Sequence, residues 1–366
     1  MKINCSKTDL MNGLNIALRA VPVRTSMPIL ECFLIEASNT IKIVTNDGDM
    51  GIETIIDGNV EKVGKVAINA RILSDIVRKL PDNVVTIETN SNFKVRIKCE
   101  DAEFIITGNN TMEFPELPVI EETNKISISQ FTLKELIRQT IFSISINDAN
   151  AIMRGELFTI DKDNIKITSL DSHRISIRNS QLSQEYKKFK SIIHGKSLIE
   201  ISRVLSGEKN DMVDISFDKK FVKFEFNNTI IVSRLIEGEY FNVEQMISSD
   251  YETCVKLNKN EFINVIERAV TLTREGEKKP IIFEIRDGEM NIEISSSIGS
   301  MNDHIYINKE GKDLTIGFNP RFFLDALKVI DEEEVNIYFV NSNAPCLIKD
   351  KEESYIYIIL PVNINK

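Results

Sequence analysis

Apolar residues at helical spacing follow short polar openings at three places along the chain. These segments begin at residues 6, 132 and 259, and each carries an acidic residue followed directly by an apolar one. The three pairs are Asp9-Leu10, Glu135-Leu136 and Glu261-Phe262, and successive pairs lie 126 residues apart. The chain therefore contains an internal repeat.

A second helical pattern recurs with almost the same period. Residues 71–80, 196–205 and 321–330 each begin with a cation and end on an aliphatic residue, and their last residues lie 125 positions apart. Two separate landmarks thus give one period, and three copies of it fill the 366 residues. We predict three units, at residues 1–124, 125–246 and 247–366.

Short segments with period-two alternation and many β-branched residues separate the helical patterns. They predict strands at residues 40–45, 92–97, 164–168, 221–226 and 290–294. Each second helix also runs into a strand, at residues 84–87, 212–215 and 334–337. The pattern predicts an α+β fold in which every unit packs two helices on antiparallel sheet.

Charge is distributed unevenly along the chain. The formal net charge is −10, yet the six helical segments sum to +8 and the remainder to −18. These segments are predicted at residues 6–24, 69–80, 131–146, 195–209, 258–279 and 320–330. Cations at helix ends also suit the helix macrodipole, which is the simpler explanation. The alternative is that all six helices face one anionic object.

Three similar units joined head to tail form an arc, and two such chains can close into a ring. Twelve helices would then line the bore, and the sheets would lie outside. Such a ring would hold DNA by its shape and its field rather than by reading bases.

Composition makes other functions less favoured. Five scattered cysteines form no CxxC pair, the three histidines are dispersed, and phosphate-loop, zinc-hydrolase and serine-hydrolase motifs are missing. We expect buried structural cysteines, no metal and no cofactor. No apolar run is long enough to span a membrane and the start is too polar for a secretion signal, so we expect a cytoplasmic protein without a membrane partner.

Five short motifs, taken in order and with the threefold period, resemble one known family. They are Met27-Pro28-Ile29-Leu30 after Arg24, Asp171-Ser172-His173-Arg174, Leu235-Ile236-Glu237-Gly238, Ile316-Gly317-Phe318-Asn319 and Leu360-Pro361-Val362. The chain resembles the bacterial sliding clamps, the beta subunits of the DNA polymerase III holoenzyme. The resemblance implies a non-catalytic processivity factor that encircles duplex DNA as a homodimer. It also implies the polymerase subunit, the clamp loader and other clamp-binding proteins as partners.

The resemblance further implies two sets of contact residues. Arg24, Asn147 and Lys196 match DNA-contacting positions, and Arg71 and Arg78 are added because of their charge. The loop at residues 148–152 lacks the aromatic residues of some relatives. Phe104 and Ile106, on an expected edge strand at residues 102–107, match one side of a dimer interface, and Thr271 and Leu272 match the other.

A peptide-binding pocket between the second and third units is also implied. Its matching positions are Met153, Leu170, Ser172, His173, Arg174, Ile175, Phe241, Met246, Phe322, Asn343, Pro345, Ile358, Leu360, Pro361 and Val362. Aliphatic residues with methionine and one arginine suit an adaptable apolar slot for short peptides. Phe241 and Gln245 replace a proline and an arginine of some relatives.

Three rival interpretations remain open from the residues alone. Asp171 and His173 share a strand face and could form an acid–base pair, although no nucleophile is linked to them. Asp161, Asp163 and the acidic run at residues 331–334 could serve a metal-dependent nuclease. A repeat scaffold that binds proteins but not DNA is the third alternative.

Overall fold

The computed structural model describes the whole chain except residues 122, 248–249, 274–278 and 365–366. It contains two compact units, which are described separately here. Unit 1 comprises Met1–Phe131 and Ile199–Leu235, and unit 2 comprises Thr132–Leu198 and Ile236–Lys366. Within the described residues, no helix is long and apolar enough to cross a membrane.

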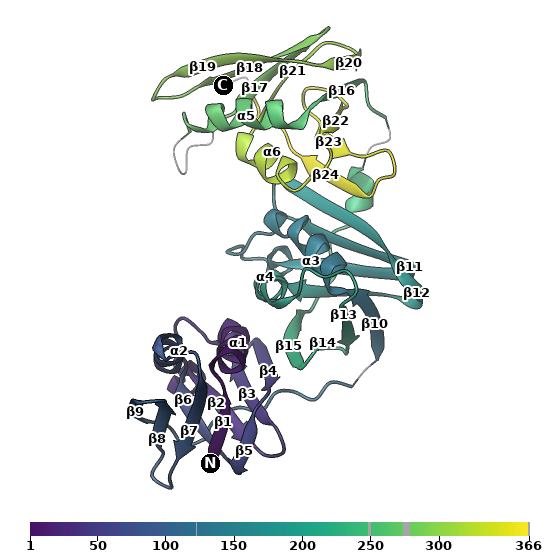
Figure 1. The fold of residues 1–366 in the computed structure, drawn as a ribbon. Helices are drawn as coiled ribbons and strands as arrows, with labels where there is room; N and C mark the ends of the chain where they lie inside the picture. The colour runs from purple at the N-terminus through teal and green to yellow at the C-terminus, as the bar shows by residue number, and fades with distance from the viewer. Residues whose placement is uncertain (122, 248–249, 274–278, 365–366) are drawn as a thin grey trace. The chain divides into compact units, whose positions relative to one another are not determined.

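Unit 1 is built on two sheets. The first has the order β5-β1-β7-β8-β9, and the second contains β15-β4-β3-β2-β6, with β14, β13 and β10 following β15 (Figure 1). The strands are β1 Lys2–Ser6, β2 Cys32–Ala37, β3 Ile41–Asn46, β4 Met50–Ile56, β5 Asn59–Lys62, β6 Gly64–Asn69, β7 Val84–Thr89, β8 Lys94–Cys99, β9 Ala102–Thr107, β10 Asn124–Ser129, β13 Met212–Phe217, β14 Phe221–Phe226 and β15 Thr229–Ile236.

Helices α1 (Lys7–Ala17) and α2 (Ala70–Lys79) lie side by side in unit 1 (Figure 1). Each follows a strand directly and begins at a capping side chain. The Ser6 hydroxyl accepts the backbone N–H of Asp9, and the Asn69 side chain accepts that of Ile72. The apolar face of each helix is buried, so its polar face stays in solvent.

Unit 2 contains the sheet β20-β16-β22-β23-β24-β12, to which β11 adds by pairing with β12, and the four-stranded sheet β19-β18-β17-β21. The strands are β11 Gly155–Leu170, β12 Arg174–His194, β16 Thr253–Asn258, β17 Ile281–Arg286, β18 Glu289–Ser295, β19 Ser300–Tyr306, β20 Asn308–Gly311, β21 Leu314–Phe318, β22 Glu334–Phe339, β23 Cys346–Lys349 and β24 Tyr355–Ile359.

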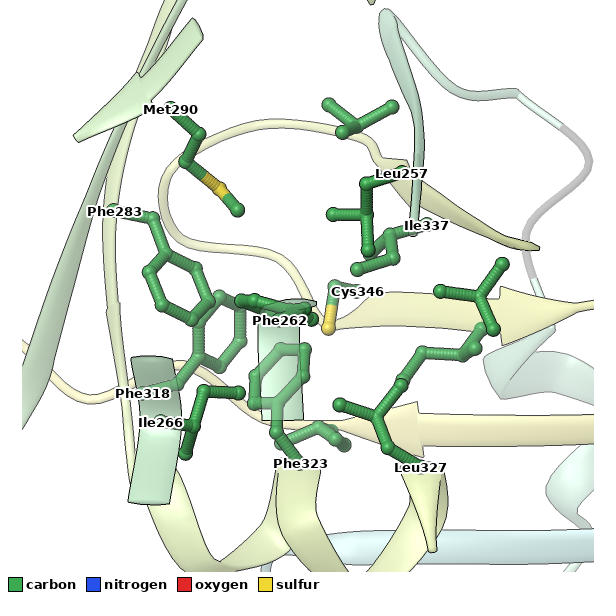
Figure 2. Packing of buried hydrophobic residues seen from close by; sticks show 14 of the residues in the cluster. Leu257, Phe262, Ile266, Phe283, Met290, Phe318, Phe323, Leu327, Ile337 and Cys346 are labelled. Atoms are coloured by element: carbon green, nitrogen blue, oxygen red, sulfur yellow. The ribbon is translucent and has the colours of Figure 1, made fainter. Parts of the chain in front are cut away.

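Helices α5 (Lys259–Val270) and α6 (Pro320–Leu327) pack together over a large aromatic core in unit 2. Figure 2 shows the rings of Phe262, Phe283, Phe318 and Phe323 meeting in this core. Five of their ring pairs have centroids 5.1–5.8 Å apart, the range in which aromatic contacts are favourable.

Strand pairing explains why the two units do not coincide with the three repeats. In unit 1, β15 pairs with β4, and in unit 2, β12 pairs with β24. Strands of the predicted middle repeat therefore cluster partly with strands of the first repeat and partly with strands of the third.

The predicted strands are confirmed, but four predicted helices are too long. The segment at 6–24 is α-helical only to Ala17, the one at 131–146 (α3, Gln130–Arg138) ends at Arg138, and the one at 195–209 (α4, Gly195–Val204) ends at Val204. The segment at 258–279 ends at Val270, and residues 274–278 lie outside the described part.

Local chemistry accounts for three of these ends, those of α1, α3 and α5. Pro22 disfavours a helical conformation at Val21, which is extended. The hydroxyls of Thr140, Thr271 and Thr273 donate to the carbonyl oxygens of Leu136, Arg268 and Val270, as terminating residues do. Because the chain is already extended at Val21, Arg24 does not lie on a helix.

Candidate functional site

A tight turn joins β11 to β12 in unit 2 and is held by one carboxylate. Asp171 Oδ1 accepts the backbone N–H groups of His173, at 2.7 Å, and Arg174, at 3.0 Å. This Asx-type turn starts β12 at Arg174 and fixes the direction in which the Arg174 side chain leaves the strand.

The Arg174 guanidinium is the centre of the site. It donates from Nε to Asp171 Oδ2 at 3.1 Å, from Nη1 to Asp325 Oδ2 at 2.5 Å and from Nη2 to the carbonyl oxygen of Phe142 at 2.5 Å. Its side chain is only 12% exposed. Because two carboxylates and a carbonyl share its donors, the arginine is locked in one position.

Two aromatic rings lie close to this guanidinium. The Arg174 Cζ atom lies 4.6 Å from the centroid of Phe322 and 5.4 Å from that of Phe142, within cation–π range. The exposed His173 ring stacks on Phe322 with centroids 5.9 Å apart. Helix α6, which carries Phe322 and Asp325, is thereby fastened to the start of β12.

Asp171 holds Arg174 rather than the His173 ring. Both carboxylate oxygens are engaged by N–H groups of Arg174 or by the backbone of His173. The His173 carbonyl accepts the backbone N–H of Leu360 at 2.9 Å, which ties the segment after β24 to the same turn. His173 thus forms part of a wall, and the acid–base pair considered from the sequence is not formed.

A compact apolar cluster includes Ile175, the residue that follows Arg174 in β12. Four predicted site residues meet there, because Leu170, Ile175 and Ile358 are buried in it and Met153 packs against it. Ile175 and Ile358 are direct cross-strand partners on β12 and β24. The remaining members were not predicted as site residues: Ile177, Val243, Leu347 and Ile356, with Tyr240, Ile247 and Tyr338 packed against them.

Large apolar side chains stay exposed around this cluster. Phe241 is 41% and Met246 is 52% exposed, and Phe241 meets the ring of Tyr240 edge-on. Exposed apolar groups over a buried apolar floor are typical of a binding surface. We call the Arg174 surroundings, the cluster and these two side chains the candidate peptide site.

The other predicted pocket residues lie outside the named helices and strands. Leu360, Pro361 and Val362 are half-buried after β24, and the Val362 N–H donates to the Gly317 carbonyl at 2.8 Å. Ser172 is exposed in the β11–β12 turn. Asn343 and Pro345 lie in the turn before β23 and are not members of the apolar cluster that the described residues form.

All five predicted DNA-contacting residues are exposed. Arg24, Arg71 and Arg78 belong to unit 1, and Asn147 and Lys196 belong to unit 2. Arg78 forms an ion pair with Asp75 at 3.0 Å, whereas Arg71 has no ion-pair partner within the described residues. The α2 face in unit 1 therefore presents an uncompensated positive charge to solvent.

The predicted interface residues lie at an edge strand and at a helix end. Strand β9 is the last strand of its sheet in unit 1, as expected. Phe104 is 39% exposed, while Ile106 is half-buried against the core of this unit. In unit 2, exposed Thr271 and half-buried Leu272 follow α5 directly.

Acidic residues at both places considered for a nuclease form ion pairs. Asp161 pairs with Lys188 at 2.6 Å, and Asp331 lies 3.6 Å from Arg138. In the part of the chain that the structure describes, no group of three potential ligands could hold a metal ion. The five cysteines are free; four are buried, as predicted, and Cys254 is half-buried.

Known proteins share the sequence pattern and the fold of this chain. Family models of the DNA polymerase III beta subunit match residues 1–118 with the N-terminal domain, 127–242 with the central domain and 244–363 with the C-terminal domain. The beta sliding clamp of Bacillus subtilis (strain 168) is 34% identical over 377 residues, covering 99% of both chains. The chain belongs to the DNA polymerase III beta subunit family.

Solved structures of the clamp family agree closely. A putative DNA polymerase III beta subunit from Eubacterium rectale is 55% identical with a TM-score of 0.96, covering 100% of both chains. The sliding clamp from Bacillus subtilis is 33% identical with a TM-score of 0.95, covering 99% of both. The predicted α+β fold of three clamp domains is confirmed, and the chain serves as a DNA polymerase processivity clamp.

Proposed function

We propose that two copies of this chain close head to tail into a ring that encircles duplex DNA without reading its sequence. Each copy would contribute three clamp units, at residues 1–124, 125–246 and 247–366. The ring would act in the cytoplasm as an accessory subunit of the replicative DNA polymerase, with no catalytic site and no cofactor of its own.

Two exposed edge strands support the closed dimer. Strand β9 ends one sheet of unit 1, and strand β19 ends the four-stranded sheet of unit 2. Unpaired edges with exposed apolar side chains invite pairing with another chain. Ile105 is 63% exposed on β9 and Tyr306 is 75% exposed on β19. We propose Phe104 and Ile106 on one side, and Thr271 and Leu272 on the other, as interface residues.

Four exposed cations and one exposed amide support non-specific contact with DNA. We propose that Arg24, Arg71, Arg78, Asn147 and Lys196 meet phosphate groups. Phosphate contacts fix position but carry no sequence information, so binding follows charge and salt. The strongly acidic remainder of the chain would repel DNA from other surfaces.

The observation that carries the tethering role is the candidate peptide site. Its locked arginine, buried apolar floor and exposed Phe241 and Met246 suit short peptides with two apolar anchors. We propose that the polymerase subunit, the clamp loader and other clamp-binding proteins use it in turn. The full set proposed to line it is Met153, Leu170, Ser172, His173, Arg174, Ile175, Phe241, Met246, Phe322, Asn343, Pro345, Ile358, Leu360, Pro361 and Val362.

Calorimetric titration tests this role. A peptide of sequence Gln-Leu-x-Leu-Phe should bind the wild type with micromolar affinity, because each buried apolar side chain contributes roughly 1.5–3 kcal/mol before ordering costs. Met246→Asp should weaken binding at least about tenfold, since it brings a charge to an apolar contact. Exposed Met112, at 86%, offers a matched control in unit 1 as Met112→Asp. Equal affinities for wild type and Met246→Asp would place the pocket elsewhere.

A further inference from the structure

One carboxylate close to the candidate peptide site pairs with a lysine of the β11–β12 hairpin and is influenced by the charges of two more. Lys166 Nζ lies 3.2 Å from Glu244 Oε1. The hydrogen bond and charge of Lys166, together with the charges of Lys190 and Lys188, hold the pKa of the Glu244 carboxyl below its usual range. The Glu244 side chain is 73% exposed, so its carboxylate lies at the surface and not in the core.

Positive charge is in excess at this place. Lys188 is paired with Asp161 at 2.6 Å, and Lys166 is paired with Glu244. Lys190 is exposed and has no ion-pair partner within the described residues. Three lysines thus face two carboxylates, in a chain whose net charge is −10.

Glu244 belongs to the same turn as two residues of the candidate peptide site. In the 3₁₀ turn Val243–Met246, Val243 is buried in the apolar cluster and Met246 is exposed. Lys166 precedes Leu170 by four residues on β11 and so lies on the same face of the sheet. At roughly 3.3 Å per residue, its Cα atom lies about 13 Å along the strand from that of Leu170.

We propose that Lys166, Lys188 and Lys190 form a cationic rim that selects partner segments with Asp or Glu about four residues from the anchored apolar side chain. Glu244 occupies this rim when no partner is bound. The inference rests on the proposed peptide-binding function and adds a charge preference to it. A peptide is favoured over nucleic acid because the rim adjoins an apolar cluster, which gives phosphate chains nothing to bind.

The test is calorimetric titration of the full-length protein at low salt. Gln-Leu-x-Leu-Phe is extended by four residues at either end and carries either Glu or Gln at the outermost position. For one of the two extensions, the Glu peptide should bind about two- to fivefold more tightly than its Gln counterpart, as exposed ion pairs do. This advantage should disappear at about 1 M salt, where the Debye length is about 3 Å.

Variants then assign the preference to the rim. Lys190→Gln should abolish the advantage of the Glu peptide, and Glu244→Gln should increase it about two- to fivefold, because the competing carboxylate is gone. Lys187→Gln is the matched control. Lys187 is also an exposed lysine of β12, but its charge is not among those that act on Glu244. It should leave the preference unchanged.

The outcomes separate the inference from the function beneath it. If no peptide binds the wild type, the peptide-binding function itself is wrong. If all peptides bind equally well, only the cationic rim is refuted. An equal loss in Lys187→Gln and Lys190→Gln would indicate a diffuse field and refute the rim. Displacement of only the Glu peptide by single-stranded DNA would show that the rim takes phosphate chains, which also refutes the assignment.

Discussion

We predict that Glu156 makes the stability of this protein depend on pH. It is the second residue of β11, it is fully buried, and neither carboxylate oxygen has a hydrogen-bond partner among the residues that the structure describes. Burial raises the pKa of Glu156 to about 8. The side chain is therefore neutral in the folded protein near pH 7, whereas it is ionised in the unfolded chain above about pH 4.5.

The folded state then binds one more proton than the unfolded state between about pH 4.5 and 8. Stability from this group is fully present below pH 4.5 and decreases by about 1.4 kcal/mol per pH unit until pH 8. By pH 7 the loss amounts to about 3 kcal/mol, a large part of the stability of a typical domain.

Glu156→Gln replaces this carboxyl by a neutral amide of nearly the same shape. Urea denaturation followed by far-UV circular dichroism should give similar midpoints for wild type and variant at pH 5. The variant should become progressively more stable than the wild type as pH rises to 8. Glu185→Gln, which changes an exposed glutamate on β12, is the control and should follow the wild type. Parallel pH profiles for wild type and Glu156→Gln from pH 5 to 8 would refute the reasoning.

Three further predictions follow from the fold. Arg71→Ala should reduce the slope of log binding constant against log salt concentration by about one unit. Arg78→Ala should reduce it by less because Asp75 already pairs with Arg78, and slopes equal to that of the wild type would contradict the phosphate contacts. Phe104→Asp and Ile106→Asp should each give monomers when the mass is measured by light scattering. Because Ile106 is half-buried, thermal melting should confirm that its variant is folded, and folded dimers would reject the interface. Gly13→Ala should lower stability by about 1–3 kcal/mol, because its Cβ would lie 2.3 Å from Ile56; an unchanged melting curve would contradict this packing.

Local periodicity predicted the repeat, the six helices and the strands between them, because each element here has its own apolar face. Helix ends were less predictable. The hydroxyls of Thr140 and Thr271 form hydrogen bonds that end their helices. The broad helical segments over which charge was summed take no account of such individual bonds. The prediction at residues 164–168 found only part of β11, because its pairing with β12 continues over bulges that break the alternation.

The candidate peptide site was likewise predicted only in part. Resemblance to the clamp family pointed to Arg174, and Leu170, Ile175 and Ile358 meet beside it in one cluster. Asp325 and Phe142, which hold the guanidinium, were missed because they are more than 30 positions away along the chain. Val243 and Leu347 were missed because nothing distinguishes them from ordinary core residues before the sheet is assembled.

Retention on DNA of different topology tests the ring most directly. The protein, loaded onto nicked circular DNA by a bacterial clamp loader, should stay bound through gel filtration in moderate salt. Cutting the circle once with a restriction enzyme should release it, because a ring without base contacts slides off a free end. Equal retention on circular and linearised DNA would mean that the protein grips DNA directly and would contradict encirclement.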